Sequence, residues 1–253
     1  MNTNKNLILL DEVDSTNQFA HGLLQNGVRI EEGTAIMSLF QTAGKGQKGN
    51  VWESEFGSNM LASVIIFPEF LEPTKLYLVN QAAALSICTI LKDYSKFEFK
   101  IKWPNDIMYG DNKIAGILIE NSIRDKKCTT CVIGVGINLN QLSFKTYSPR
   151  AISLKMITGK SIDSIQEFTK KWRDALMDYF ELIRSGQERK ISDAYSKSLF
   201  GIGENREFES DGVHIKGTIE GVTKEGRLMI KTDTGTREFG IKEVRYIFNQ
   251  ENQ

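Results

Sequence analysis

The sequence KWPNDIMYGDNKIAGILIE, residues 102–120, decides the fold class because it places short apolar runs in succession with only tight turns between them. The run at residues 97–103 alternates apolar and charged residues, as a half-buried strand does. Pro104 is not expected inside a central strand, so the chain turns at 103–106, and it turns again at 110–112. Consecutive strands with such short connections pair antiparallel, because a parallel pair needs a long crossover.

The rest of residues 1–200 mixes further strands with helices. Apolar runs of strand length lie at residues 7–10, 34–40, 60–67, 107–109, 113–120 and 131–139. A helix opens at Asp14–Gln18, where Ser15 and Gln18 have the spacing of a capping box, and helical patterns recur at 76–91 and 164–183. Helices combined with mainly antiparallel strands indicate an α+β fold.

Beyond Gly201 the composition changes to short β-rich runs. These runs lie at residues 217–222, 227–232 and 236–241, and K-E-G and D-T-G turns separate them. Regularly spaced short strands with glycine turns indicate a small β-barrel. We therefore expect two domains, residues 1–200 and residues 201–253.

Composition and charge exclude several classes of protein. The 253-residue chain is 40% hydrophobic and 25% charged, which is typical of a folded globular protein. Its 32 basic residues balance 32 acidic ones, so no global field would gather nucleic acid or an anionic membrane. No apolar run approaches the ~20 residues of a membrane span, and the polar start MNTNKN lacks a signal peptide. We expect a soluble, cytoplasmic protein with neither nucleic-acid nor membrane partners.

The three cysteines do not predict a metal or redox centre. CTTC at 128–131 has the spacing of a redox pair or of half a zinc site. A second pair of ligands is missing, and His21 and His214 are isolated. We interpret the pair as residues at the beginning of a strand.

The glycine-rich stretch QTAGKGQKGNVW, residues 41–52, follows a predicted strand and is a candidate anion-binding loop. It matches G-x-G-x-x-G, but no helix follows as a dinucleotide-binding motif requires. The Walker A pattern fails because Asn50 and Val51 replace lysine and serine or threonine. What remains is an irregular loop whose glycines permit close backbone approach and whose lysines add positive charge. A plain surface turn is the alternative.

Other polar groups stand at the ends of strands and helices. KWPND makes a rigid bend that presents Lys102, Asn105 and Asp106, to which Lys113 can return, although an ordinary turn and a solvent-facing lysine are the alternatives. The stretch 14–17 can cap its helix and also bind a polar ligand. Glycines at 134 and 136 within a strand suggest either close approach to the backbone or a bulge.

Five segments, taken in order, resemble those of the biotin protein ligases. They are DSTN at 14–17, the loop at 41–52, KWPND at 102–106, KIAGILIE at 113–120 and GVGINLN at 134–140. The resemblance implies a class II synthetase-like α+β catalytic domain followed by a small SH3-like barrel. It also implies a two-step reaction: the biotin carboxylate attacks the α-phosphorus of ATP, and a lysine of a biotin carboxyl carrier protein then accepts the biotinyl group from the adenylate.

The same resemblance implies roles for particular residues. Biotin would be bound by Ser15, Thr16, Asn17, Gln41, Lys45, Gly46, Gln47, Lys113 and Gly116. ATP would be bound by Gln47, Lys48, Trp52, Lys102, Asn105, Asp106, Lys113 and Asn138. Lys45, Lys113 and Asp106 would act in catalysis. Mg²⁺ would enter with ATP near Asp106 rather than occupy a structural metal site.

Two departures from the family pattern stand out. Many relatives have arginines in the glycine loop, where this chain has Lys45, Gln47 and Lys48 and so lacks planar guanidinium forks. Some relatives begin with a DNA-binding helix-turn-helix, whereas the catalytic segments of this chain begin almost at once. Repressor activity is therefore not expected.

Two other functions are consistent with parts of the sequence. A lipoate ligase or acyltransferase on the related fold is the nearer alternative, but Gln41 and the Ser-Thr-Asn segment favour the polar ureido ring of biotin. A non-catalytic nucleotide or nucleic-acid binding module would account for the β-rich tail, but the neutral charge argues against it. The sequence does not fix the oligomeric state, and it leaves a homodimer open.

Overall fold

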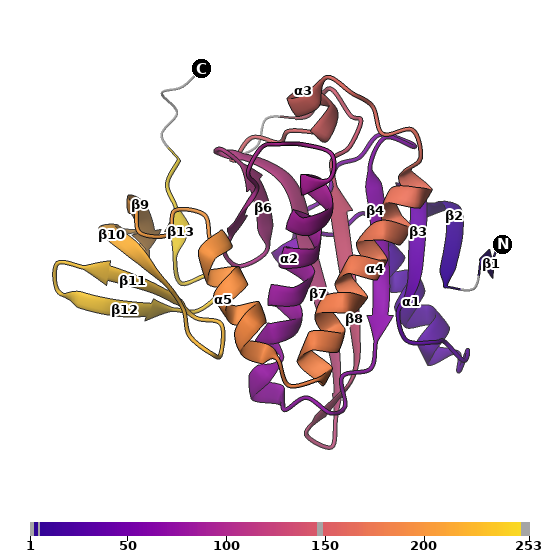
Figure 1. The fold of residues 1–253 in the computed structure, drawn as a ribbon, viewed down its shortest axis with the longest axis horizontal. Helices are drawn as coiled ribbons and strands as arrows, with labels where there is room; N and C mark the ends of the chain where they lie inside the picture. Colours follow the sequence, from indigo (N-terminus) through magenta and orange to yellow (C-terminus); the bar gives the residue numbers. More distant parts are fainter. Residues whose placement is uncertain (1–2, 5, 146–148, 249–253) are drawn as a thin grey trace.

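A computed structural model describes residues 3–4, 6–145 and 149–248, and these residues form two separate sheets (Figure 1). The larger sheet has the strand order β1-β2-β3-β4-β8-β7-β6-β5. Its strands are β1 (Thr3–Asn4), β2 (Leu7–Val13), β3 (Thr34–Gln41), β4 (Met60–Ile66), β5 (Lys100–Lys102), β6 (Asp106–Tyr109), β7 (Asn112–Arg124) and β8 (Lys127–Ile137). Among the described strands, β2 and β3 pair in parallel and the other neighbours pair antiparallel, which confirms the expected α+β class.

The parallel pair exists because helix α1 (Thr16–Gln25) crosses between β2 and β3. Ser15 stands at its N-cap but makes no side-chain capping bond, so the predicted capping box is wrong. The first N–H groups find other acceptors: the N–H of Ser15 donates to Asp14 Oδ1 at 2.7 Å and that of Thr16 to Gln41 Oε1 at 2.7 Å. The start of α1 is thus tied to the end of β3, and this places both beside one site.

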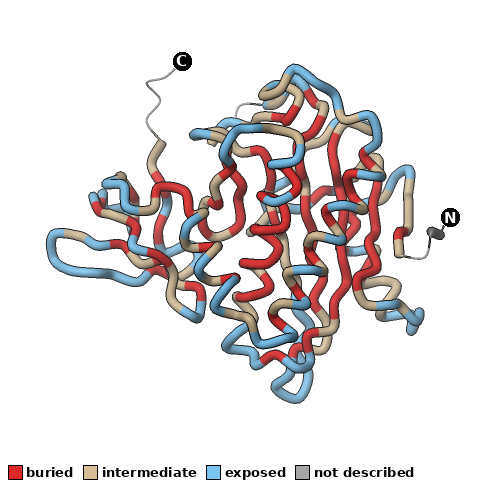
Figure 2. Tube along the Cα trace, in the orientation of Figure 1, coloured by how far each residue is buried: buried red, intermediate tan, exposed pale blue. Residues whose placement is uncertain are grey.

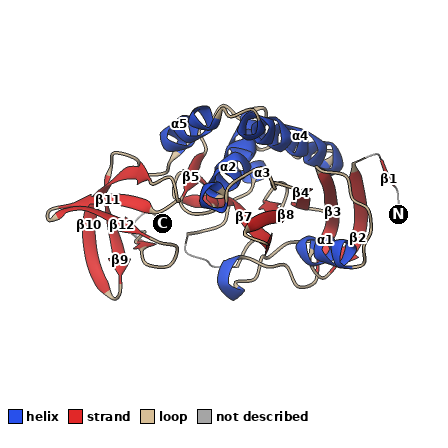
Figure 3. Cartoon of the chain, turned by 90° about the horizontal axis from the view of Figure 1, so that it is seen from below, coloured by secondary structure: helices blue, strands red, loops and turns tan. Residues whose placement is uncertain are grey.

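Helices cover the two faces of the larger sheet unequally (Figure 3). One face carries α2 (Tyr77–Lys92), α4 (Ile165–Arg184) and α5 (Glu188–Ser198), and the other carries α1. Strand residues alternate between these faces, so that Ala62 and Val64 join the large core with α2 and α4, while Ile65 packs with Ala20 of α1. Helix α1 covers only part of its face of the sheet. Polar strand residues and glycines lie on the uncovered part of that face.

Helix α2 is the central helix of the core. With its leading 3₁₀ turn (Pro73–Lys75), it is long and apolar enough, by length and composition, to span a membrane. Its most apolar window is 67% buried inside the protein, which is also what a core helix shows. Figure 2, in the orientation of Figure 1, shows much of this helix in the red of buried residues.

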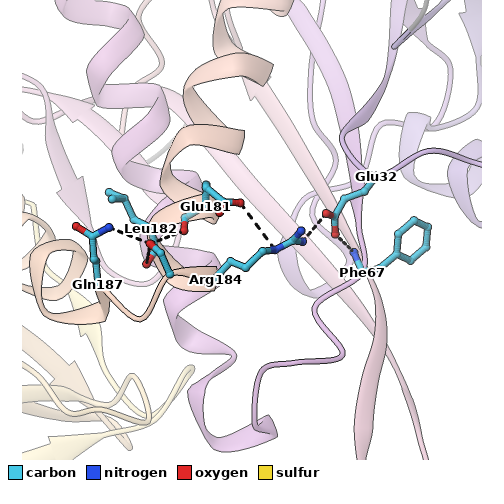
Figure 4. Close-up of polar contacts among 7 residues, drawn as sticks. Glu32, Phe67, Glu181, Leu182, Arg184 and Gln187 are labelled. Atoms are coloured by element: carbon cyan, nitrogen blue, oxygen red, sulfur yellow. Dashed lines mark hydrogen bonds and ion pairs between the residues drawn. The ribbon is translucent and has the colours of Figure 1, made fainter.

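The end of α4 is fixed to the neighbouring loops by a small polar network (Figure 4). Arg184 contacts Glu32 at 2.5 Å, and the other carboxylate oxygen of Glu32 accepts the N–H of Phe67 at 2.9 Å. This network lies where β3 begins and β4 ends, whereas the glycine loop follows the opposite end of β3.

The second sheet is formed by the C-terminal part of the chain. It contains β9 (Asn205–Ser210), β10 (Val213–Val222), β11 (Leu228–Thr232), β12 (Gly235–Phe239) and β13 (Arg245–Tyr246), in the order β12-β11-β10-β9-β13. All its described pairs are antiparallel. It contacts the rest of the chain through a turn: Trp103, just after β5, donates its Nε1–H to the carbonyl of Gly226, between β10 and β11, at 2.9 Å. Residues 249–253 of the expected second domain lie outside the described residues.

Several expected elements differ from those in the structure; for example, the strand expected at 7–10 runs to Val13. The strand expected at 97–103 is reduced to β5, because its partner β6 ends at Tyr109 and the chain then turns at Gly110. The rings of Phe97 and Phe99 pack on Tyr109 there. The β7–β8 hairpin is longer than expected, running to Arg124 and resuming at Lys127. Residues 121–124 of β7 are solvent-exposed and carry no apolar pattern, although Cys128 opposite them is buried. Helix α5 was missed because only Ile191 and Tyr195 are buried along it.

Candidate active site

A cavity of about 870 Å³ lies on the α1 face of the larger sheet. It is lined by the start of α1, the glycine loop, strands β6 to β8 and the C-terminal segment that contains β13. The predicted site residues on its wall are Ser15, Thr16, Asn17, Gln41, Lys45, Gly46, Gln47, Trp52, Lys102, Asn105, Asp106, Lys113, Gly116 and Asn138. Lys48 has its backbone in a 3₁₀ turn (Gln47–Gly49), but its side chain lies outside the described part of the chain. Segments spread over residues 15–138 of the sequence therefore meet at one place.

Glycines form the floor of the cavity. Gly116 of β7 pairs directly with Gly136 of β8, and Gly134 lies two residues along the same strand. A Cβ atom on Gly136 would collide with the Trp52 indole, and one on Gly134 would collide with the Asn17 amide. The β8 register is regular here, so close approach of side chains, and not a bulge, explains these glycines.

One end of the cavity is a network of neutral hydrogen bonds. The hydroxyls of Thr16 and Ser63 lie 2.7 Å apart, and Ser63 Oγ lies 2.6 Å from Asn17 Oδ1. Gln41 Oε1 accepts the N–H of Thr16 at 2.7 Å. Thr16 and Asn17 are each 3% exposed and Ser63 is 0% exposed, so the network is fixed by burial. We call this group, with Ser15, the polar end.

The other end is a cluster of charged groups, which we call the lysine end. Asp106 on β6 receives Lys102 of β5 at 2.9 Å and Lys113 of β7 at 2.6 Å, one lysine on each carboxylate oxygen. Burial disfavours the charged carboxylate, but the two lysine charges and their hydrogen bonds outweigh burial and hold the pKa of Asp106 below its usual value. The cluster therefore carries a net positive charge that an anionic ligand can share.

The backbone positions Lys113 from two sides. Its N–H donates to the carbonyl of Arg150 at 2.7 Å, and its carbonyl accepts the N–H of Ile152 at 2.9 Å. Its ammonium lies 5.5 Å from the centroid of a Trp52 ring, a cation–π distance. Lys113 is thus held between the floor of the cavity and Asp106.

Two buried polar atoms on the wall have no hydrogen-bond partner among the described residues. They are Nε1 of Trp52 and Oδ1 of Asn138. The amide nitrogen of Asn138 is already engaged, donating to the carbonyl of Ile152 at 3.2 Å. Because a buried unpaired polar group costs about 1–3 kcal/mol, these two atoms are suited to bond a ligand. Asn105, by contrast, uses its Nδ2 to bind the carbonyl of Ile117 at 2.8 Å and secures the KWPND turn.

The glycine loop is more ordered than the irregular loop we expected. Trp52 donates its N–H to the carbonyl of Gly44 at 2.9 Å, and Gly46 donates to the carbonyl of Asn50 at 2.7 Å. These bonds fold the loop back on itself as a small hairpin above the floor. A Cβ on Gly44 would come within 2.8 Å of the Trp52 carbonyl, so this hairpin requires a glycine there.

Sequence reasoning missed the part of the wall that comes from the C-terminal segment. Arg245, Tyr246 and Phe248 line the cavity, and Lys102 Nζ lies 5.3 Å from the Tyr246 ring centroid. It also missed Ser63 at the polar end. No local signal marks these residues, because their role depends on which distant strands become neighbours.

A cavity that joins neutral hydrogen-bonding groups to a lysine cluster suits ligands that are polar at one end and anionic at the other. The family model described as the Biotin/lipoate A/B protein ligase family matches residues 9–138, about half of the chain. The chain belongs to this family, as the five segments predicted.

Individual relatives agree with the family match. The Bifunctional ligase/repressor BirA of Bacillus spizizenii is 30% identical over 244 residues, covering 92% of this chain and 72% of that protein. The Biotin--[acetyl-CoA-carboxylase] ligase of Paracoccus denitrificans is 24% identical and covers 93% of this chain and 98% of that protein. The solved biotin protein ligase from Aquifex aeolicus, in complex with biotin and ATP, matches with a TM-score of 0.80 and 27% identity over 96% of this chain and 100% of that chain.

Proposed function

We propose that this protein is an ATP-dependent biotin protein ligase, which joins biotin to a lysine of a biotin carboxyl carrier protein through biotinyl-5′-AMP. The observation that carries the proposal is the cavity with two chemically different ends, one neutral and hydrogen-bonding and one cationic. The Aquifex relative is described with biotin and ATP bound, and the Paracoccus relative is named as a ligase for acetyl-CoA carboxylase. Both descriptions fit a cavity of this kind.

The polar end would bind the ureido ring of biotin. That ring has two N–H donors and a carbonyl acceptor, which suits hydroxyl and amide groups held in fixed positions. The groups assigned to it are Ser15, Thr16, Asn17 and Gln41, while Lys45, Gly46, Gln47 and Gly116 would surround the rest of the molecule. The glycine floor supports this assignment, since Gly134 lets the Asn17 amide lie directly against strand β8.

The lysine end would bind the triphosphate. Lys102 and Lys113 would exchange part of their contact with Asp106 for phosphate oxygens, and Lys113 would reach the biotin carboxylate as well. Trp52 would border the adenine, with Gln47, Lys48, Asn105 and Asn138 completing the nucleotide site. Because two anions repel each other, fixed ammonium groups lower the barrier most by stabilising the charge that develops in the transition state.

Asp106 is a suitable carboxylate ligand for Mg²⁺. Mg²⁺ with a nucleotide commonly takes one or two carboxylates along with substrate phosphates. Asp106 is ionised and stands among the lysines, so it would hold the ion together with the triphosphate. The bound ion would offset phosphate charge, and the lysines would remain to orient the reacting oxygens.

We further propose that the chain is organised as a catalytic domain, residues 1–200, and an SH3-like barrel domain, residues 201–253. The separation of the two sheets supports a boundary near residue 200. The second domain would close the lysine end through Arg245 and Tyr246. A cytoplasmic location would give the enzyme its carrier and ATP, and β1 and β2 form an edge through which a homodimer could pair.

Carrier labelling tests the proposed function. The protein is incubated with ATP, Mg²⁺, biotin and a biotin carboxyl carrier domain, and the carrier is analysed by mass spectrometry. We expect one carrier lysine to gain a biotinyl group with release of pyrophosphate. Absence of labelling on a carrier that another biotin ligase modifies would reject the proposal, and labelling with lipoate in preference to biotin would assign the lipoate alternative instead.

A further inference from the structure

Glu120 lies on β7 just beyond the wall of the cavity and contacts the polar end from behind. Its Oε2 accepts a hydrogen bond from Asn17 Nδ2 at 2.7 Å and lies 3.5 Å from Nε2 of His21. Asn17 Nδ2 also approaches the carbonyl of Leu118 at 3.3 Å. The Glu120 side chain is 41% exposed, whereas Asn17 is 3% exposed. A partly solvated carboxylate thus anchors a buried amide.

Glu120, with the shorter hydrogen bond, and the carbonyl of Leu118 together fix which way the Asn17 amide points. An ionised carboxylate has no proton to donate, so the atom of Asn17 that faces it must be the NH₂ group. The carbonyl oxygen of Asn17 therefore faces Ser63 Oγ, at 2.6 Å. This assignment follows from chemistry, since an amide oxygen and nitrogen cannot be told apart by shape alone.

The remaining protons of the network then follow in order. Asn17 Oδ1 needs a donor at 2.6 Å, so the single Ser63 hydroxyl proton goes to Asn17. The hydroxyl oxygens of Thr16 and Ser63 lie 2.7 Å apart, and Gln41 Oε1 lies farther from Thr16 Oγ1, at 3.1 Å. Because Ser63 has only one proton and gives it to Asn17, we infer that Thr16 supplies the proton of its contact with Ser63. Gln41 Oε1 is still satisfied by the backbone N–H of Thr16. The chain of donors runs from Thr16 through Ser63 and Asn17 to Glu120.

The direction of this series of hydrogen bonds determines whether the cavity presents a donor or an acceptor to a ligand at Thr16. With its proton committed to Ser63, the Thr16 hydroxyl presents lone pairs and acts as an acceptor. A reversed chain would make the same hydroxyl a donor. Hydrogen bonds in such a series polarise one another, so a charge at one end strengthens the acceptor character at the other.

We infer that Glu120 is a positioning residue that sets the donor–acceptor pattern of the ureido-ring site, by fixing the amide of Asn17 and thereby making Thr16 an acceptor for a ureido N–H. This inference rests on the proposed function for the identity of the ligand. Glu120 does not touch the ligand, and its effect is confined to ligands that carry N–H donors in this ring.

Binding measurements on paired variants test the inference. In Glu120→Ala, Asn17 loses its charged acceptor, and we expect the Kd for biotin to rise about tenfold, the scale of a lost hydrogen bond to a charged group. In Glu120→Gln an acceptor oxygen is retained, and the rise should stay within about threefold. Calorimetric titration gives Kd for each, with Glu181→Ala on the exposed surface of α4 as the control that should not change.

Ligand analogues separate positioning from general damage. Desthiobiotin keeps the ureido ring, so Glu120→Ala should weaken it as much as biotin. Nonanoic acid has an acyl tail and carboxylate without the ring, so its inhibition constant should not change, and neither should the KM for ATP in pyrophosphate exchange. Equal weakening of nonanoic acid would overturn the inference, because it would indicate a distorted cavity.

The coupling between Glu120 and Ser63 gives a second, independent readout. Ser63→Ala breaks the same donor chain, so its effect on biotin affinity should not add to that of Glu120→Ala in the double variant. Additive effects, or an unchanged biotin Kd in Glu120→Ala, would overturn the inference. If the wild-type protein fails to bind biotin at all, the proposed function fails first, and that result is distinct from a wild-type protein that binds while its variants show no difference.

Discussion

The two ends of the cavity solve the problem of ligand binding in opposite ways. At the polar end, buried hydroxyl and amide groups bond to one another, and Thr16, Asn17 and Ser63 are each at most 3% exposed. At the lysine end, Lys102 and Lys113 neutralise Asp106, and their side chains are 14% and 27% exposed. Recognition of a neutral ring can be built in advance, whereas an anion site must keep its cations occupied until the anion arrives.

This comparison predicts that the largest single effect on activity lies at the lysine end. Replacing Lys113 by Ala should lower the rate of biotinyl-adenylate formation by at least about a hundredfold, because a fixed cation is lost where charge develops. Biotin-dependent pyrophosphate exchange measures this rate. Lys126→Ala, at the exposed turn of the β7–β8 hairpin, is the matched control and should retain the wild-type rate. Wild-type exchange in Lys113→Ala would remove its proposed role.

Asp106→Asn should give the largest loss of stability. It leaves two largely buried lysines without their partner, so we expect about 3 kcal/mol of destabilisation near neutral pH. The folded-state pKa of Asp106 is lowered, so its contribution is present above the unfolded pKa of about 4 and is lost as pH falls through the folded value. Denaturant unfolding across pH should show the gap between wild type and variant narrowing in acid. A gap independent of pH would contradict the assigned ion pair.

Substitution of a glycine in the cavity floor should cause a smaller loss of stability than Asp106→Asn. The floor lies under both ends of the cavity. Gly136→Ala forces the Trp52 indole off the sheet, and overpacking of this kind costs about 1–3 kcal/mol. Gly22→Ala is the control, because nothing lies within 4 Å of the position of its Cβ inside α1 and the exchange should stabilise the helix by about 0.5–1 kcal/mol. Thermal unfolding, followed by tryptophan fluorescence, should show a lower Tm for Gly136→Ala and a higher Tm for Gly22→Ala than for the wild type.

The smallest effect should come from an ion pair outside both ends. Arg184→Ala removes the contact with Glu32 shown in Figure 4, where Arg184 is 42% exposed, so the loss should stay below about 1 kcal/mol. Carrier labelling should proceed at the wild-type rate. A large loss of labelling in this variant would mean that residues at the start of β3 influence the cavity. Differences between the polar end and the lysine end would then not account for activity by themselves.

The sequence predicted the parts of the fold that have strong local patterns. The structure confirms strand β4, expected at 60–67, and the helices expected at 76–91 and 164–183. Each of their boundaries agrees within one residue. The predicted capping box was wrong: the Ser15 side chain makes no capping bond, and the N–H groups of Ser15 and Thr16 donate to Asp14 and Gln41. Gln41 is 25 residues from Thr16, and no local pattern reports such a contact.

What the sequence determined by itself is the chemistry carried by each segment: the glycine loop, the KWPND bend, the strand glycines and the β-rich tail. Short-range turns and side-chain periodicity are local, so residue order alone specifies them. What the tertiary structure decided is which of these groups meet. Tyr246 beside Lys102, Ser63 beneath Asn17 and Glu120 behind Asn17 all arise from the packing of strands and loops distant in sequence. Long-range packing depends on the whole chain burying its apolar surface at once, and therefore only the folded protein places them.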